Sequence, residues 1–266
     1  MSNKHPDHIF DGYVFDLDGT VYLGEALLPT AQQTIATLKS HGASVVFLSN
    51  NPLQSRMDYA AKLTWLGIPT TPEEVINSSW VMARWLVNQA AGATLFVIGE
   101  DPLKNELGAN GFHLSEDPEQ IDFVIASFDR TFDYRKLQIA FNAIRAGARF
   151  VATNADPYCP VPGGGLPDAG AVIGAIEGCT GQPVEIVVGK PSHLTVQAIL
   201  KRLQLPAGKC LMVGDRLQTD IRMGKTSGMA TAVTLTGVTT QEILAQSEIQ
   251  PDYVLEHLED LYRRIY

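Results

Sequence analysis

Tyr13-Val14-Phe15-Asp16-Leu17-Asp18-Gly19-Thr20 is an apolar run that ends in two carboxylates and a glycine. The apolar residues favour a buried strand, and glycine adopts turn conformations that other residues avoid. Because residues i and i+2 of a strand point the same way, Asp16 and Asp18 can converge on one point. Converging carboxylates repel each other unless a cation lies between them, and Mg²⁺ is the simplest such cation. The alternative is a polar Asp-Gly turn that only ends a strand.

The composition is that of an ordinary globular protein. The chain has 266 residues, 45% of them hydrophobic, which suits one large domain or two small ones. Its N-terminus is polar and no run approaches the roughly 18 apolar residues of a membrane helix, so we expect a soluble, cytoplasmic protein without a membrane partner. The net charge of −9 disfavours a nucleic-acid partner. The 3 cysteines are widely spaced and indicate reduced thiols rather than a metal site or disulfide framework.

Strand-like and helix-like segments alternate from Tyr13 onward, which is typical of a parallel sheet covered by helices and indicates the α/β class. Residues 79–184 form an alternating unit of their own, either a continuation of one sheet or an inserted second domain. Their closing segment, residues 154–169, is dense in Pro and Gly and is expected to be a loop with a binding role. Strands are expected at residues 12–16, 44–49, 94–98, 121–126, 148–153, 184–188, 209–213 and 230–235.

Polar residues follow several of these strands. In open parallel sheets, ligands bind at the carboxyl ends of the strands, where loops and helix N-termini gather. The Ser49 hydroxyl and backbone N–H groups at Asn50 would suit the equatorial oxygens of a phosphoryl group. Four strand ends carry such residues: Asp16 with Asp18, Ser49 with Asn50, Lys190, and Asp215 with Asp220.

The chemistry that these strand ends suit is phosphoryl transfer. Asp16 is a nucleophile as a carboxylate, and Asp215 can hold a metal that reduces its repulsion from an incoming phosphate. Lys190 places a fixed cation beside the transferring group. Asp18 is then left to handle the proton.

The same residues, in this order, resemble the four motifs of the haloacid dehalogenase (HAD) superfamily. A second Asp in the first motif is typical of its phosphatase branch. The unit between the second and third motifs, with Ser49-Asn50-Asn51 and Gly189-Lys190-Pro191, resembles the NagD-like subfamily (class IIA), which carries a C2-type cap. The resemblance implies a Rossmann-like, doubly wound parallel-sheet core of residues 1–78 and 185–266, with an inserted α/β cap domain at residues 79–184.

The resemblance also implies the roles of the site residues. Asp16 would attack the phosphoester to give an aspartyl phosphate, and Asp18 would protonate the leaving oxygen and then deprotonate the hydrolytic water. Mg²⁺ would be held by the Asp16 carboxylate, the Asp18 backbone carbonyl and Asp215. Lys190 would stabilise charge, and Asp220 would lie just outside the metal ligands, orienting water or Lys190.

The expected function is therefore a Mg²⁺-dependent phosphatase of small phosphorylated metabolites, with sugar phosphates as the expected class. Nucleotide monophosphates, pyridoxal phosphate and p-nitrophenyl phosphate are alternatives within the same chemistry. A phosphotransferase and a catalytically silent module that binds a phosphorylated ligand are alternatives of other classes. Asp168, which stands where the subfamily more often has a small residue, is expected to face the substrate. Arg216 is either beside the phosphate or solvated, and a homodimer through the cap is implied by the resemblance alone.

Overall fold

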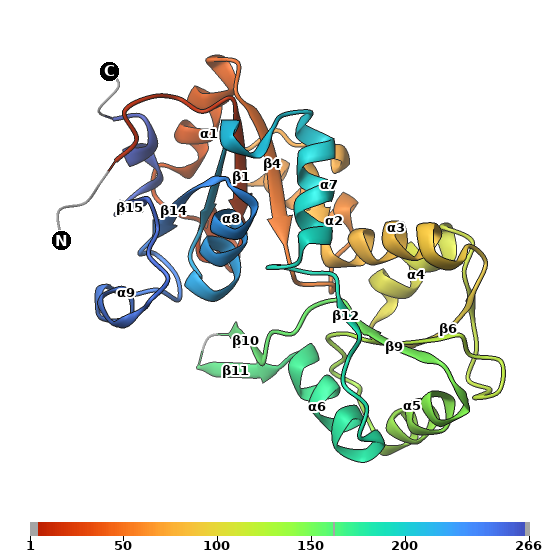
Figure 1. Ribbon diagram of the computed structural model, residues 1–266. Coiled ribbons are helices and arrows are strands. Elements are labelled where there is room, and N and C mark those ends of the chain that lie inside the picture. Colours follow the sequence, from red (N-terminus) through yellow and green to blue (C-terminus); the bar gives the residue numbers. More distant parts are fainter. Residues whose placement is uncertain (1–4, 162, 264–266) are drawn as a thin grey trace. The chain divides into compact units, whose positions relative to one another are not determined.

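The computed structural model describes residues 5–161 and 163–263 and divides the chain into two compact units (Figure 1). The first unit contains residues Met1–Ser49, Arg56–Ile76 and Lys190–Tyr266. The second contains Asn50–Ser55 and Asn77–Gly189. The chain therefore passes between the units directly after Ser49 and directly before Lys190, so two strand ends singled out in the sequence lie at unit boundaries.

The first unit is built on a six-stranded sheet with the order β15-β14-β13-β1-β4-β5. Strand β1 is parallel to both of its neighbours, and β14 is parallel to β13 and β15. Because β4 and β13 lie on opposite sides of β1, the winding of the sheet reverses at β1, and such a switch point is where open α/β sheets bind ligands. The strands are β1 Gly12–Asp16, β4 Ser44–Ser49, β5 Val75–Asn77, β13 Cys210–Gly214, β14 Ala230–Thr234 and β15 Tyr253–Leu255.

Helices cover this sheet. The helices α1 (Ala31–Ser40) and α2 (Arg56–Trp65) pack their apolar faces into one core cluster with Tyr13, Phe15 and Phe47 of the sheet. Because this cluster is apolar, the carboxylates at the strand ends border an apolar interior. The unit also contains α7 His193–Leu203, α8 Arg222–Ser227, α9 Gln241–Gln246, the hairpin of β2 Tyr22–Leu23 and β3 Ala26–Leu27, short 3₁₀ turns at Pro72–Glu74, Ala207–Lys209 and Leu258–Leu261, and a π-helical turn at Leu217–Ile221.

The second unit has a five-stranded sheet of its own, with the order β12-β9-β8-β6-β7 and every neighbouring pair parallel. Helices α5 and α6 pack on the face that contains Val124 and Phe150. On α3, the Trp85 ring packs perpendicular to the Phe123 ring, with 6.1 Å between centroids. The elements are α3 Ser78–Ala90, β6 Thr94–Ile98, α4 Asp101–Ala109, β7 His113–Leu114, β8 Phe123–Ala126, α5 Tyr134–Ala146, β9 Arg149–Ala152, α6 Ala169–Thr180 and β12 Ile186–Val187.

The α/β class and the parallel sheets predicted from the sequence are confirmed. Each expected strand is present, although the one expected at residues 184–188 is reduced to Ile186–Val187. The expected loop at residues 154–169 is wrong in part, because it contains an antiparallel hairpin of β10 (Tyr158–Val161) and β11 (Gly164–Pro167). Its glycines turn the chain, with Gly163 at φ 86°, rather than breaking the strands. Among the described residues, no helix is long and apolar enough to cross a membrane.

Candidate active site

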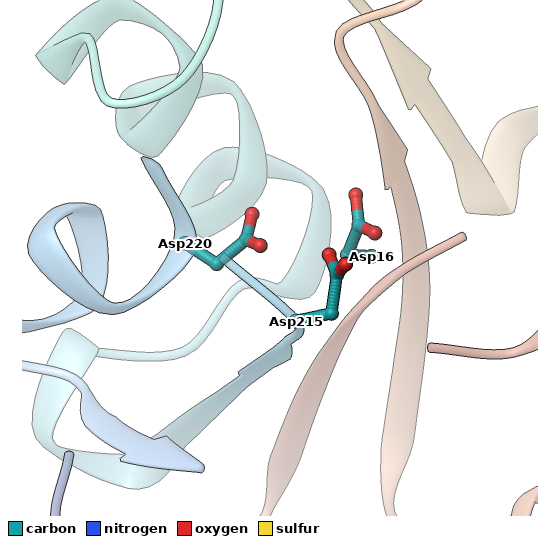
Figure 2. Close-up of side chains that lie close together, drawn as sticks. All are labelled: Asp16, Asp215 and Asp220. Atoms are coloured by element: carbon teal, nitrogen blue, oxygen red, sulfur yellow. The ribbon is translucent and has the colours of Figure 1, made fainter. Parts of the chain in front are cut away.

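Three buried carboxylates meet at the carboxyl ends of β1 and β13. Asp16 is the last residue of β1, Asp215 follows β13 directly, and Asp220 lies in the π-helical turn after it. Each offers an oxygen within 4.8 Å of the others, and the three residues are only 8%, 2% and 0% exposed (Figure 2). So close a grouping of buried negative charge is stable only with positive charge beside it.

Lys190 supplies one such charge. Its Nζ donates to Asp16 Oδ1 and, at 2.7 Å, to Asp220 Oδ1. Burial disfavours the charged ammonium, but the two carboxylates outweigh this effect and raise the pKa of Lys190 above its ordinary value. Burial also raises the pKa of Asp16 well above its ordinary value; Lys190 opposes this shift, and Asp220 and Asp215 add to it. One lysine therefore does not offset all the negative charge.

Asp215 shows where further positive charge fits. Its Oδ2 accepts a hydrogen bond from the Val238 backbone N–H at 2.7 Å, whereas its buried Oδ1 has no hydrogen-bond partner among the described residues. Burial, followed by repulsion from Asp220, raises the pKa of Asp215 to about 6. An unsatisfied buried carboxylate oxygen beside a second carboxylate suits a hard divalent cation. The Asp16 and Asp215 side chains therefore fit a metal site.

The Asp220 carboxylate is already occupied by donors. Its Oδ1 accepts from Lys190, and its Oδ2 accepts from the Arg216 backbone N–H at 3.1 Å. Close approach to β13 depends on Gly214, since a Cβ there would lie 2.4 Å from Asp220 Cβ. Asp220 thus holds the ammonium and the start of the loop, rather than presenting a free oxygen to a metal.

The loop after β14 completes the site, and the sequence analysis missed it. Thr236 Oγ1 donates to the Gly19 carbonyl at 2.7 Å, and the Thr239 backbone N–H donates to the Asp215 carbonyl at 3.1 Å. A Cβ at Gly237 would lie 2.1 Å from Asp215 Oδ2, so only glycine fits there. The signal was present: Thr236-Gly237-Val238-Thr239 is another run of small and polar residues directly after an expected strand.

Asp18 is placed differently from its neighbour. Strand β1 ends at Asp16, so the alternation that would aim both side chains at one point stops there. The carboxylate of Asp18 is outside the cluster of three, and the residue is exposed. Protein atoms around its carboxyl still displace enough water to raise its pKa, and the charges of Lys62 and Lys190 oppose that shift. The Asp18 carboxylate is therefore not one of the three that gather, and the expected convergence of the Asp16 and Asp18 side chains stays a prediction.

Ser49 and Asn50 fall on the two sides of a unit boundary. In the first unit, the buried Ser49 hydroxyl lies 3.1 Å from the Tyr59 hydroxyl. In the second unit, Asn50 Nδ2 donates to Asp156 Oδ2 at 2.8 Å, and Asn154 Nδ2 donates to the same oxygen at 3.0 Å.

Arg216 is a half-buried residue of the first unit. Its positive charge lowers the pKa of Asp215 and so counteracts the burial that raises it.

Asp168 lies at the N-terminus of α6 in the second unit. Its buried Oδ1 accepts from the Ala169 backbone N–H at 2.5 Å and from Asn154 Nδ2 at 3.0 Å.

We expect Asp168→Ala to lower the free energy of unfolding by about 1 kcal/mol through loss of this helix cap. Asp168→Asn, which keeps a capping oxygen, is the control, and urea unfolding measures both. Equal stability of the Ala variant and the wild type would contradict the capping role. Contact between Asp168 and substrate stays a prediction, which a change in KM of the Asn variant would support.

Comparison with known proteins agrees with this geometry. A family model described as haloacid dehalogenase-like hydrolase matches residues 13–113, and a HAD-hydrolase-like model matches residues 187–261. The sugar-phosphatase AraL of Bacillus subtilis (strain 168) is 38% identical over 250 residues, which cover 94% of this chain and 91% of that protein. The chain belongs to the haloacid dehalogenase-like hydrolases. The NagD-like subfamily predicted from the motifs is confirmed.

Other relatives of this HAD-like hydrolase carry different phosphatase names. The 5'-nucleotidase YutF of the same Bacillus strain is 35% identical over 94% of this chain and 96% of that protein. A 4-nitrophenylphosphatase structure from Thermotoga maritima has a TM-score of 0.92 and 35% identity, covering 97% of this chain and 98% of that one. A glycerol phosphate phosphatase from Mycobacterium tuberculosis, solved in complex with magnesium, has a TM-score of 0.88 and 33% identity, covering 97% of this chain and 78% of that one.

Proposed function

We propose that this HAD-like hydrolase is a Mg²⁺-dependent phosphatase of small phosphorylated metabolites, with Asp16 as its nucleophile. The observation that carries the proposal is the buried Asp16 carboxylate, bonded to Lys190 and grouped with Asp215, whose second oxygen has no donor among the described residues. The phosphatase names of relatives that match most of this chain support the same chemistry.

The reaction proceeds by two displacements at phosphorus. A carboxylate oxygen of Asp16 forms a bond to phosphorus while the bond to the leaving oxygen breaks, and Asp18 gives its proton to that oxygen. Water then attacks the phosphorus of the aspartyl phosphate, Asp18 accepts the proton, and the Asp16 carboxylate is restored. The raised pKa of Asp18 suits a group that must first hold a proton and then take one back.

The remaining side chains hold charge in place. Lys190 offsets the charge of Asp16 and of the transferring group, and Asp220 fixes its ammonium. We assign binding of the phosphoryl oxygens to the Ser49 hydroxyl, the backbone at Asn50 and the Arg216 guanidinium. Asp16, the Asp18 backbone carbonyl and Asp215 would hold Mg²⁺. When bound, the ion supplies positive charge against the phosphoryl oxygens.

The substrate class that we favour is the sugar phosphates, because a sugar phosphatase is among the relatives that match most of the chain. The second unit would act as the cap that reads the leaving group, and the first as the catalytic core. A 5'-nucleotidase at 35% identity keeps nucleotide monophosphates as the second candidate. A silent phospho-ligand module is disfavoured, because Asp16, Asp18, Lys190 and Asp215 are all present.

Phosphate release from a panel of substrates tests this function. We expect release from sugar phosphates and p-nitrophenyl phosphate with Mg²⁺, and loss of release with EDTA that excess Mg²⁺ restores. A higher kcat/KM for nucleotide monophosphates or pyridoxal phosphate would overturn the substrate class but not the chemistry. Release that appears only with an added alcohol acceptor would indicate a phosphotransferase. No release from any compound would contradict the phosphatase assignment.

A further inference from the structure

A buried phenol lies beside one of the proposed phosphoryl-binding groups. Tyr59 on α2 is only 2% exposed, within the main core of the first unit. Its hydroxyl lies 3.1 Å from Ser49 Oγ, and Ser49 is the last residue of β4 and is itself buried. The mechanism above gives Tyr59 no role. The pair lies at the same carboxyl edge of the sheet as Asp16, because β4 is the parallel neighbour of β1.

The chemistry of two hydroxyl groups gives this contact a direction. A serine hydroxyl has one proton and two lone pairs, and its proton rotates to whichever acceptor is available. If Ser49 donates to a phosphoryl oxygen, the lone pairs of its own oxygen can accept from Tyr59. A donor on that oxygen prevents the serine proton from turning toward the phenol, and successive hydrogen bonds strengthen each other in a site of low dielectric constant.

We propose that Tyr59 is a positioning residue that donates to Ser49 Oγ and thereby aims the Ser49 proton at the transferring phosphoryl group. The inference rests on the proposed function, which assigns phosphoryl binding to Ser49. Since Tyr59 acts on the group being transferred rather than on the leaving group, its effect is the same for every phosphomonoester that the enzyme hydrolyses.

Helix α2 is held in a way that suits a positioning role. At its first residue, Arg56 Nε donates to the Val75 carbonyl at 2.9 Å. One turn after Tyr59, the Lys62 ammonium lies 4.2 Å from the centroid of the Tyr22 ring. The phenol is therefore carried on a helix anchored on both sides of it, and a group that is already ordered costs no further ordering during the reaction.

A double-mutant cycle tests the proposal. Tyr59→Phe, Ser49→Ala and the double variant are assayed with a sugar phosphate and with p-nitrophenyl phosphate. We expect Tyr59→Phe to lower kcat by about 3- to 10-fold with both substrates, the effect of one hydrogen bond. In the Ser49→Ala background, the same change should cost less than about 2-fold, because its target is gone.

Tyr13→Phe is the matched control. Tyr13 is a fully buried tyrosine of the same core, and its hydroxyl accepts from the Phe10 backbone N–H at 3.1 Å. Tyr13→Phe also removes a buried hydroxyl, and we expect it to leave kcat unchanged. Thermal unfolding of every variant checks that the assayed protein is folded.

The outcomes separate this inference from the proposed function. An equal loss for Tyr59→Phe with and without Ser49 would mean that the phenol acts through core packing, and would overturn the inference. Full kcat of Tyr59→Phe beside an impaired Ser49→Ala would also overturn it, while leaving Ser49 in its role. Full kcat of Ser49→Ala would overturn both the Ser49 assignment and the inference. Full kcat of Asp16→Asn would overturn the proposed function as a whole.

Discussion

Asp16→Asn should lower kcat by about 10³-fold or more, because an amide cannot form the bond to phosphorus that a carboxylate forms. The fold should survive the change. The substitution removes one buried negative charge, which Asp215 and Asp220 repel. Lys190 keeps its hydrogen bond to Asp220 at 2.7 Å. Phosphate release at saturating substrate and Mg²⁺ measures the loss, and mass spectrometry after acid quenching detects the phosphorylated enzyme in the wild type only.

Asp11→Asn is the control for this experiment. Asp11 directly precedes β1, is exposed, and pairs with Lys209 at 2.8 Å on the surface. Surface pairs of this kind contribute about 0–1 kcal/mol, so the variant should match the wild type in kcat and in melting temperature. If Asp16→Asn instead kept a tenth or more of the Mg²⁺-dependent activity, another residue would have to be the nucleophile.

The part of this site that was predictable from sequence is the part encoded by strands. A buried parallel strand is a nearly continuous apolar run, so its end is visible as the first polar residue, as at Asp16, Ser49 and Asp215. The carboxyl ends of parallel strands share one edge of the sheet, which is why residues about 200 positions apart could be expected to meet. The Asp16 and Asp215 side chains indeed fall within one cluster.

The parts that were not predictable depend on backbone geometry beyond the strands. The strand ends at Asp16 and the chain turns at Gly19, where φ is 83°, so strand alternation gives no information on where the Asp18 side chain points. The loop at Gly237 brings a donor to one oxygen of Asp215, while the other oxygen has no partner among the described residues, and no sequence pattern shows this asymmetry. The hairpin at β10 and β11 was hidden because Pro and Gly suggest breaks, although glycine at its turn supports the pairing.

The second large effect is expected at Asp215. There, a rise in pH should lower the stability of the metal-free protein, and Mg²⁺ binding should raise it. Its pKa is raised to about 6 from the ordinary value of 3.8, so in metal-free protein the folded carboxyl keeps its proton to higher pH than the unfolded one. The folded state therefore binds more protons between pH about 4 and 6, and the stability from this group is lost as pH rises through that window. The raised pKa of Asp16 acts with the same sign.

Melting temperatures in EDTA and in Mg²⁺, from pH 4 to 8, measure this effect. We expect the wild type in EDTA to lose stability across the window, Asp215→Asn to lose less because it has no charge to repel, and Asp11→Asn to behave as the wild type. Mg²⁺ should stabilise the wild type above pH about 6, where the carboxylate is ionised, and should not stabilise Asp215→Asn. The same variant should lose about 10²-fold or more in kcat, since it lacks a ligand and retains the nucleophile.

The sign of that stability change distinguishes a metal ligand from a carboxylate that merely supports the fold. A supporting carboxylate would be stabilised by its donors, and replacing it would lower the melting temperature in EDTA at neutral pH. Asp215 has a donor on one oxygen and none on the other among the described residues, and it is repelled by Asp220. We therefore expect Asp215→Asn to melt at or above the wild-type temperature in EDTA at pH 7, although it is nearly inactive. Lower stability in EDTA, or equal stabilisation of both proteins by Mg²⁺, would remove Asp215 from the metal site.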